Sequence, residues 1–133
     1  MISHKLPQIW YGADYNPDQW PEELWAEDMR LMRLAHVNVA TLPVFSWALL
    51  QPAEDRYEFA WLDRILDQMA ENGIYACLAT STAAQPAWMS QRFPDVLTTG
   101  RDGLKRRHGG RVNFCPTSAN YRRYSAALAE QLA

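Results

Sequence analysis

Short apolar runs recur along the chain and alternate with stretches that have the periodicity of amphipathic helices. The runs cover residues 9–13, 37–42 and 74–80, and the first ends in the turn-forming residues D-Y-N-P. Short runs that lack strict alternation are typical of strands covered on both faces in a parallel sheet. The pattern therefore predicts three parallel strands, each followed by a connection that contains a helix.

The first helix is predicted to begin at Pro21, because proline presets the helical φ and Glu22 and Glu23 place acids at the positive end of the helix dipole. We expect it to stop near Ala35, with His36 as the C-terminal turn residue, a conformation for which glycine is best suited. His36 is therefore interpreted as structural. The apolar side that should face the sheet comprises Leu24, Trp25, Met29, Leu31, Met32 and Leu34.

Two further long helices are predicted, with a short one between them around residues 88–92. The first of the two ends at Asn72-Gly73, and the second begins at Pro116-Thr117-Ser118. Their expected buried stripes are Trp61, Leu62, Ile65, Leu66 and Met69 in the first, and Tyr121, Tyr124, Leu128 and Leu132 in the second.

The order of these elements indicates an α/β fold with a parallel sheet and outer helices, since strand and helix repeat from Val37 to Ile74. An open nucleotide-binding sheet would carry a glycine fingerprint after the first strand. Gly12 stands there alone, and no G-x-G-x-x-G or G-x-x-x-x-G-K-[ST] occurs. The long, aromatic-rich loops after the strands instead favour part of a (β/α)8 TIM barrel, in which such loops carry the function.

Composition excludes several classes of protein. The 133 residues are 48% hydrophobic with a net charge of -2, so neither nucleic acid nor an anionic membrane is an expected partner. No apolar run is long enough to cross a bilayer, and the chain starts without an apolar leader. Only Cys77 and Cys115 are present, so a disulfide framework is not expected and a cytoplasmic location is predicted.

The long connection after the third strand holds the main candidates for recognition, Arg111 and Cys115. A guanidinium is a planar fork of donors that can face sugar hydroxyls, although an isolated loop arginine is more often solvated. Residues 105–108, K-R-R-H, lack interleaved aromatics and are interpreted as a solvated loop. Cys115 could bind zinc only with further thiolate or imidazole ligands, because structural zinc is four-coordinate.

Other candidates are more simply explained by packing. Phe45, Trp47 and Trp88 could be apolar platforms for sugar rings, but each is more commonly a packing residue. Asp14 follows the first strand and is expected to brace the turn through local hydrogen bonds. Cys77 lies within an apolar strand and is interpreted as core.

Four separated blocks resemble one family. They read Y-G-A-D-Y-N-P-D-Q-W-P, N-V-A-T-L-P-V-F-S-W-A-L-L-Q-P, N-G-I-Y-A-C-L-A-T and G-G-R-V-N-F-C-P-T-S, in this order and each at or after a predicted strand. Together they are similar to the N-terminal part of the β-galactosidases of glycoside hydrolase family 42. The resemblance implies a (β/α)8 barrel, retaining hydrolysis of terminal non-reducing β-D-galactose, homotrimeric assembly and, in some members, structural zinc.

The resemblance also implies roles for two residues. Arg111 matches the arginine that hydrogen-bonds the galactosyl unit, and Cys115 matches the first of four zinc-binding cysteines. The chain, 1–133, is then a partial catalytic domain that holds three β/α units, stops after the third helix and contains neither catalytic glutamate. Alone it is expected to be inactive and to bind no zinc. The alternative is a non-catalytic carbohydrate-binding or interaction module of β/α type.

Overall fold

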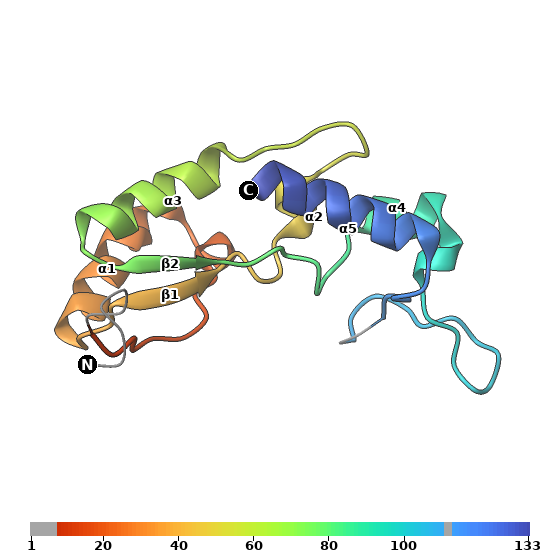
Figure 1. Cartoon of the computed structure of the whole chain (residues 1–133), viewed down its shortest axis with the longest axis horizontal. Helices are drawn as coiled ribbons and strands as arrows, with labels where there is room; N and C mark the ends of the chain where they lie inside the picture. Colours follow the sequence, from red (N-terminus) through yellow and green to blue (C-terminus); the bar gives the residue numbers. More distant parts are fainter. Residues whose placement is uncertain (1–7, 111–112) are drawn as a thin grey trace. The chain divides into compact units, whose positions relative to one another are not determined.

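A computed structural model describes residues 8–110 and 113–133 of the chain (Figure 1). These residues form two compact units, one made of the described residues up to Leu42 with Ala60–Leu78, the other of Pro43–Phe59 with Ala79–Ala133. The elements in chain order are η1 (Pro17–Gln19), η2 (Glu22–Leu24), α1 (Trp25–Leu34), β1 (Val39–Leu42), α2 (Trp47–Leu50), α3 (Ala60–Glu71), β2 (Tyr75–Leu78), α4 (Ala87–Arg92), η3 (Pro94–Val96) and α5 (Ala119–Leu132).

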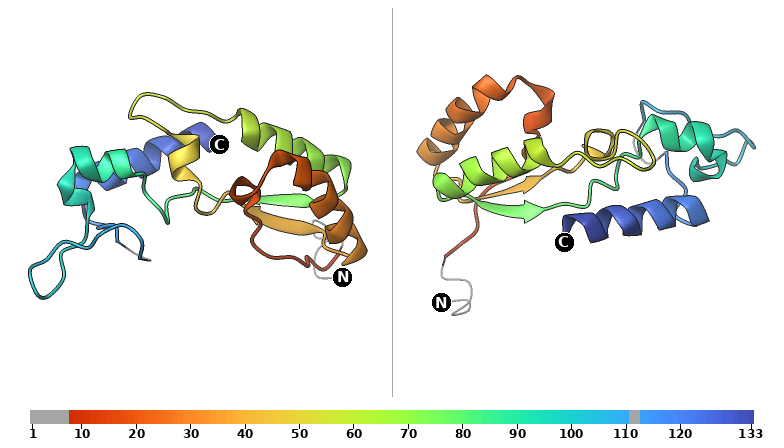
Figure 2. Two further views of the ribbon diagram at one scale, coloured as in Figure 1. Left: turned by 180° about the vertical axis from the view of Figure 1, so that it is seen from behind. Right: turned by 90° about the horizontal axis from the view of Figure 1, so that it is seen from above.

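The first unit is a two-stranded parallel sheet with helices on one face. β1 and β2 pair in register from Val39 with Tyr75 to Leu42 with Leu78. Figure 2 shows α1 and α3 on the same face of this sheet. The core between the layers is apolar and consists of Trp25, Met29, Ala40, Leu42, Leu62, Ile65, Met69 and Ile74. The prediction of a parallel α/β sheet with outer helices is confirmed.

The predicted first strand, residues 9–13, is not a regular strand. Its pairing with β1 is a single bridge between Asp14 and Thr41, where the Tyr15 amide donates to the Thr41 carbonyl at 2.9 Å. Upstream, the Asn38 backbone amide donates to the Tyr11 carbonyl at 3.0 Å. The Asn38 side chain adds two bonds: its Oδ1 accepts from the Tyr11 amide at 2.8 Å, and its Nδ2 donates to the Ile9 carbonyl at 2.9 Å. Side-chain bonds of Asn38 therefore stand beside backbone bonds in this pairing, and residues 9–13 do not form a regular ladder with β1.

The ends of α1 and α3 are the same structural motif. His36 and Gly73 both have left-handed backbones, with φ of 58° and 70°. After each, a backbone amide reaches back to the last helical turn: Val37 donates to Met32 and Ile74 to Met69, both at 2.9 Å. The prediction that His36 is a turn residue at a helix end is confirmed.

The predicted apolar side of α1 is too wide. Trp25 and Met29 are buried, but Leu24, Leu31 and Leu34 are exposed. At 3.6 residues per turn these leucines fall on a different side of the helix from Trp25 and Met29. The sheet covers only one of the two sides.

The third predicted strand is also less covered than expected. β2 has four exposed residues, among them Cys77, which is therefore not a core residue. In the described residues β2 has one neighbouring strand, β1, and Ile74, just before the strand, is buried while the four strand residues are not. An apolar run predicts a strand, but its burial depends on elements on both sides of the sheet.

The second unit packs short helices around α5. Tyr121, Tyr124 and Leu128 of α5 are buried as predicted, and the Ser118 side chain caps the helix by accepting from the Tyr121 amide at 3.1 Å. The short helix expected near residue 88 is α4, whereas α2 was not anticipated. Other buried apolar residues of this unit are Trp47, Leu50, Met89 and Val96.

Candidate functional site

The segment between β2 and α5 contains a hairpin-like arm, which the sequence indicated only as a long loop. The described residues of this arm are 97–110, 113 and 114. Isolated antiparallel bridges pair Leu97 with Phe114 and Thr99 with Lys105. The Thr98 amide donates to the Asn113 carbonyl at 2.9 Å, and the Arg106 amide donates to the Thr98 carbonyl at 2.8 Å. The arm is therefore held by backbone hydrogen bonds, like a short β-hairpin.

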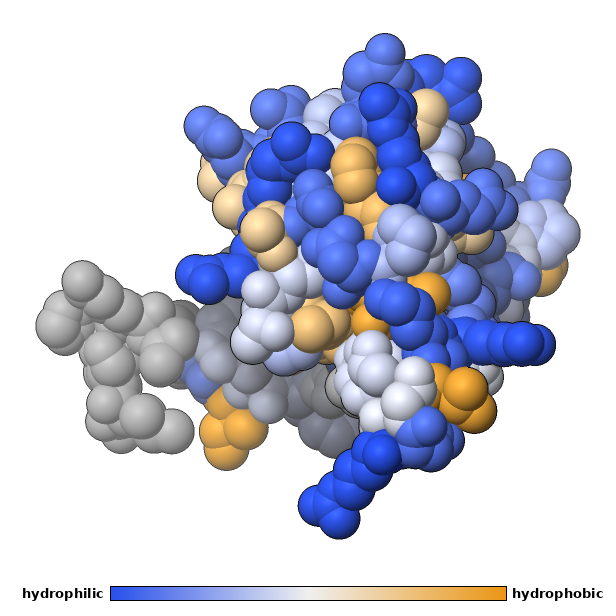
Figure 3. Space-filling view, turned by 90° about the vertical axis from the view of Figure 1, so that its right-hand side faces the viewer, coloured by the Kyte–Doolittle hydropathy of each residue, from blue (hydrophilic) through white to orange (hydrophobic). Residues whose placement is uncertain are grey.

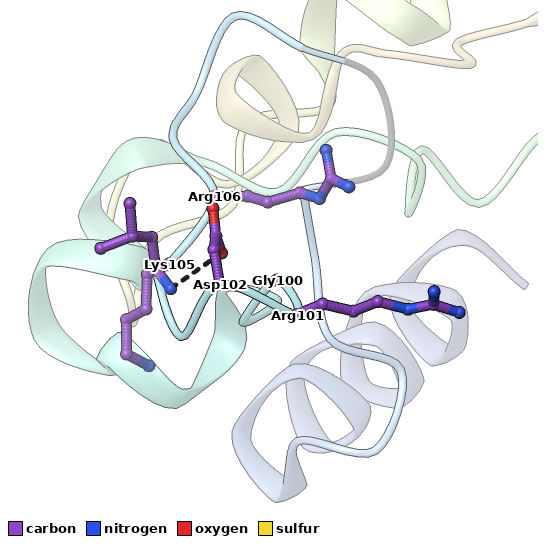
Figure 4. A pocket seen from close by; sticks show the side chains of 6 residues that line it. Gly100, Arg101, Asp102, Lys105 and Arg106 are labelled. Atoms are coloured by element: carbon purple, nitrogen blue, oxygen red, sulfur yellow. Dashed lines mark hydrogen bonds between the residues drawn. The ribbon is translucent and has the colours of Figure 1, made fainter.

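The turn of this hairpin is cationic and exposed (Figure 4). A shallow hollow of about 600 Å³ is lined by Gly100, Arg101, Asp102, Leu104, Lys105 and Arg106. Arg101 and Arg106 extend to one side of the turn and Lys105 to the other, so the cations do not converge on one point. The carboxylate of Asp102 accepts from the Leu104 amide at 3.0 Å and so stabilises the turn.

The cationic run that includes Lys105, Arg106, Arg107 and His108 is exposed, in agreement with the interpretation as a solvated loop. His108 contacts the Ser90 hydroxyl through Nε2 at 2.5 Å, and the Lys105 amine donates to the Pro94 carbonyl at 2.5 Å. Hydrophilic residues also dominate the molecular face drawn in Figure 3.

Arg111, the predicted galactose ligand, lies outside the described residues, so its role stays a prediction. The nearest described residues differ in environment: Gly110 is exposed, whereas Asn113 is buried and its side-chain Nδ2 donates to the Arg107 carbonyl at 3.5 Å.

Cys115 is a free, half-buried thiol just before α5. Its amide donates to the Val96 carbonyl at 2.7 Å, and its sulfur lies 3.1 Å from the Thr117 hydroxyl. The hydrogen bond with the Thr117 side chain, aided by the Thr117 backbone, lowers the pKa of the thiol. A thiolate is the form that binds metal. In the described ranges, however, no three His, Cys, Asp or Glu residues gather around a common point.

A polar cluster centred on Asp95 fixes the start of α5, and the sequence pattern did not reveal it. Asp95 accepts hydrogen bonds from the Ser118 hydroxyl at 2.5 Å and from the Asn120 amide at 3.0 Å. These bonds, the one from Ser118 foremost, lower the pKa of the Asp95 carboxyl. The cluster orients the helix start that follows Cys115.

The aromatic candidates are divided between core and surface. Trp47 is fully buried and donates through Nε1 to Gln51 at 2.9 Å, so it is a packing residue and not a sugar platform. Trp88 is half-buried, donates to the Gln51 carbonyl at 2.9 Å and meets Tyr124 edge to face. Phe45 remains exposed.

Glu54 is the centre of a second cluster that sequence reasoning missed. Its carboxylate accepts from the Tyr124 hydroxyl and pairs with Arg92. Arg123 donates to the Tyr124 hydroxyl at 2.7 Å and lies over the Tyr124 ring, 4.5 Å from its centroid. Burial, followed by the bond to Glu54, raises the pKa of Tyr124. No local signal marks Glu54, because its partners lie far along the chain.

Comparison with protein families identifies the chain. The model of glycoside hydrolase family 42, described as beta-galactosidase, matches residues 14–133. The chain belongs to this family. Relatives include β-galactosidase BgaA of Planococcus sp. (strain 'SOS Orange'), 58% identical over 134 aligned positions, and β-galactosidase LacZ of Heyndrickxia coagulans, 50% identical over 129. The alignments cover 100% and 97% of this chain but only 20% and 19% of those relatives.

Solved structures of family 42 enzymes agree with the fold. The β-galactosidase from Bacillus circulans sp. alkalophilus is 52% identical and superposes with a TM-score of 0.93, over 99% of this chain and 20% of that one. The β-galactosidase from Rahnella sp. R3 gives the same TM-score at 44% identity. The parallel strands and their helices are therefore part of an α/β barrel.

The family 42 chain spans about a fifth of the length of these relatives. Within the ranges that the structure covers, no helix is both long and apolar enough to cross a membrane. Asp14, the carboxylate nearest to the end of the first predicted strand, is exposed, and the backbone around it bridges to Thr41.

Proposed function

We propose that this chain supplies the opening β/α units of a retaining β-galactosidase that removes terminal non-reducing β-D-galactose. The observation that carries the proposal is the 58% identity to Planococcus β-galactosidases over the whole of this chain. The parallel pairing of β1 and β2 under α1 and α3 supports it, since a (β/α)8 barrel is built from such units.

The part played by the chain is binding and not bond cleavage. Retaining hydrolysis needs two carboxyl groups about 5 Å apart, one as nucleophile and one as acid and base. The proposed catalytic pair lies in the remainder of the enzyme, and no catalytic residue is assigned here. Arg111 is proposed to donate hydrogen bonds to galactose hydroxyls, for which its fork of donors is suited. The 133-residue chain alone is accordingly expected to be inactive.

Cys115 is proposed as one ligand of a structural zinc in the complete enzyme. The lowered pKa of its thiol fits this role, because zinc binds the thiolate. A single thiol supplies one of the four ligands that structural zinc needs, so the chain alone should not retain the metal. The complete enzyme is further proposed to be a cytoplasmic homotrimer that needs no cofactor for catalysis and binds neither nucleic acid nor membrane.

A chimera tests the proposal. In it, this chain replaces the aligned fifth of Planococcus BgaA, and hydrolysis of an aryl β-galactoside is measured. We expect turnover by the chimera and none by the 133-residue chain. Arg111→Ala in the chimera should raise KM, while Arg122→Ala, an exposed arginine on α5, should not. A chimera that folds but does not hydrolyse the substrate, or a chain that does so alone, would contradict the proposal.

A further inference from the structure

Two residues other than glycine have left-handed backbones in the described part of the chain, and only one is explained by a helix end. His36, with φ of 58°, ends α1. Ser81, with φ of 56°, lies three positions after the end of β2 and begins a turn in which the Ala84 amide donates to the Ser81 carbonyl at 3.4 Å. Serine adopts this region at a cost, so the conformation persists only where surrounding contacts impose it, and such sites cluster at functional positions.

The Ser81 side chain shows what imposes the turn. Ser81 is 1% exposed, and its hydroxyl donates a hydrogen bond to the Pro43 carbonyl. Pro43 is fully buried and directly follows β1, while Ser81 follows β2. The hydroxyl therefore ties together the two segments that leave the adjacent parallel strands.

The contacts continue from this turn to Phe114, the last residue of the hairpin-like arm. The carbonyl of Thr82 accepts from the Tyr121 hydroxyl at 2.7 Å. The Tyr121 ring stacks on Phe114, with centroids 4.7 Å apart and planes 3° from parallel. Phe114 is three positions beyond Arg111. The turn at Ser81 is thus linked through Tyr121 to Phe114, which lies near the proposed galactose ligand in the sequence.

We propose that Ser81 is a positioning residue for galactoside binding. Its left-handed turn and its bond to Pro43 set the course of the segment that follows β2, and Tyr121 transmits that placement to Phe114. Loops after strand ends build the active site of (β/α)8 enzymes, and small displacements of a binding group weaken substrate positioning. The inference rests on the proposed function, because it requires that Arg111 bind the sugar.

Ser81→Ala in the BgaA chimera tests the inference. We expect KM for an aryl β-galactoside to rise about fivefold, which is about 1 kcal/mol at 1.4 kcal/mol per tenfold. We expect kcat to change by less than about twofold, since the loss is in uniform binding. Ser46→Ala is the matched control: Ser46 is 2% exposed, has a φ of -94°, and its hydroxyl has no partner among the described residues. Its KM should be unchanged.

Tyr121→Phe is the second variant and carries the test if Ser81→Ala does not fold. It keeps the ring on Phe114 but removes the hydroxyl that donates to Thr82, so KM should also rise. Tyr11→Phe, at a tyrosine that is 60% exposed, is its control. The inference is overturned if KM stays at the parent value in both variants, if the controls shift it equally, or if only the melting temperature falls. An unsubstituted chimera without activity instead refutes the proposed function, and this inference with it.

Discussion

The two strands of the sheet have similar sequences and opposite environments. β1, V-A-T-L, alternates between half-buried and buried residues, and Leu42 is fully buried. β2, Y-A-C-L, is exposed at every position, and Leu78 is 42% exposed. β1 has a neighbour on each side, the bridge at Asp14 and β2, whereas β2 has β1 alone within the described residues. An apolar run therefore indicates a strand, and neighbouring elements decide how far it is buried.

The comparison also explains where stability resides. Burial of apolar surface stabilises by roughly 25 cal/mol per Å², so equal side chains contribute unequally when one is still in contact with water. An exposed strand edge also presents unpaired backbone groups to other chains. The following predictions test the contrast between β1 and β2, from the largest expected effect to the smallest.

Leu42→Ala should lower the free energy of unfolding of the 133-residue chain by about 3 kcal/mol, because it leaves a cavity in a closed core. Leu78→Ala should lower it by less than about 1 kcal/mol, because the side chain is already in contact with solvent. Urea denaturation at low protein concentration, followed by circular dichroism, measures both.

The BgaA chimera sharpens this test. If the rest of the barrel covers β2, Leu78→Ala should there become nearly as costly as Leu42→Ala. If both variants lose the same free energy of unfolding in the 133-residue chain, β2 is already buried there and the contrast between β1 and β2 is refuted.

The exposed edge of β2 should cause self-association of the 133-residue chain. Light scattering across a concentration series should show oligomers, and Leu78→Lys should reduce their mass, since a charge on an edge strand opposes strand pairing. Leu49→Lys is the control, because Leu49 is 48% exposed but lies on α2. A monodisperse monomer with a sharp thermal transition would defeat the prediction.

The helix ends before the two strands should respond in opposite directions. Gly73→Ala should destabilise by about 1 kcal/mol, since the Cβ of alanine is strained in a left-handed backbone that glycine adopts freely. His36→Gly should stabilise by about 0.5 kcal/mol. It removes the strain of the left-handed backbone, and the greater conformational entropy of the unfolded chain offsets part of this gain. The shifts in urea midpoint measure both, and a destabilising His36→Gly would mean that the imidazole itself makes needed contacts.

The smallest effect should come from the surface ion pair that joins η2 to α3. Glu22 accepts from Arg64 at 2.7 and 2.8 Å, and the bond from Arg64 lowers the pKa of Glu22 below its usual 4.5. A lowered folded-state pKa means that the contribution is present above the unfolded pKa and disappears as pH falls through the folded value.

Glu22→Gln should therefore slightly reduce the loss of unfolding free energy as the pH falls. Added salt should diminish the difference between the variant and the parent chain. Asp67→Asn, at an exposed acid of α3, is the control. An equal change in both variants would assign the effect to net charge and not to the pair.

The sequence by itself determined the fold class and most of the elements. Several helix ends followed from local chemistry: Ser118 caps α5, and the left-handed residues His36 and Gly73 end α1 and α3. The start predicted at Pro21 was wrong for the α-helix, because a 3-10 turn, η2, follows Pro21 and α1 begins only at Trp25. The stripe Tyr121, Tyr124 and Leu128 was also predictable, since helical periodicity places these residues on one side. These features depend on near neighbours in the chain and can be read from a single segment.

Only the tertiary structure decided which predicted surfaces are covered and which polar groups meet. Three features each depend on segments distant in sequence: the bonds of the Asn38 side chain to Ile9 and Tyr11, the exposure of Cys77 and the burial of Trp47. The bond from Ser81 to Pro43 spans 38 positions and that from Tyr124 to Glu54 spans 70, so no local pattern contains both partners. Periodicity indicates which residues favour burial. Which residue each of them contacts is determined only by the tertiary packing of the whole chain.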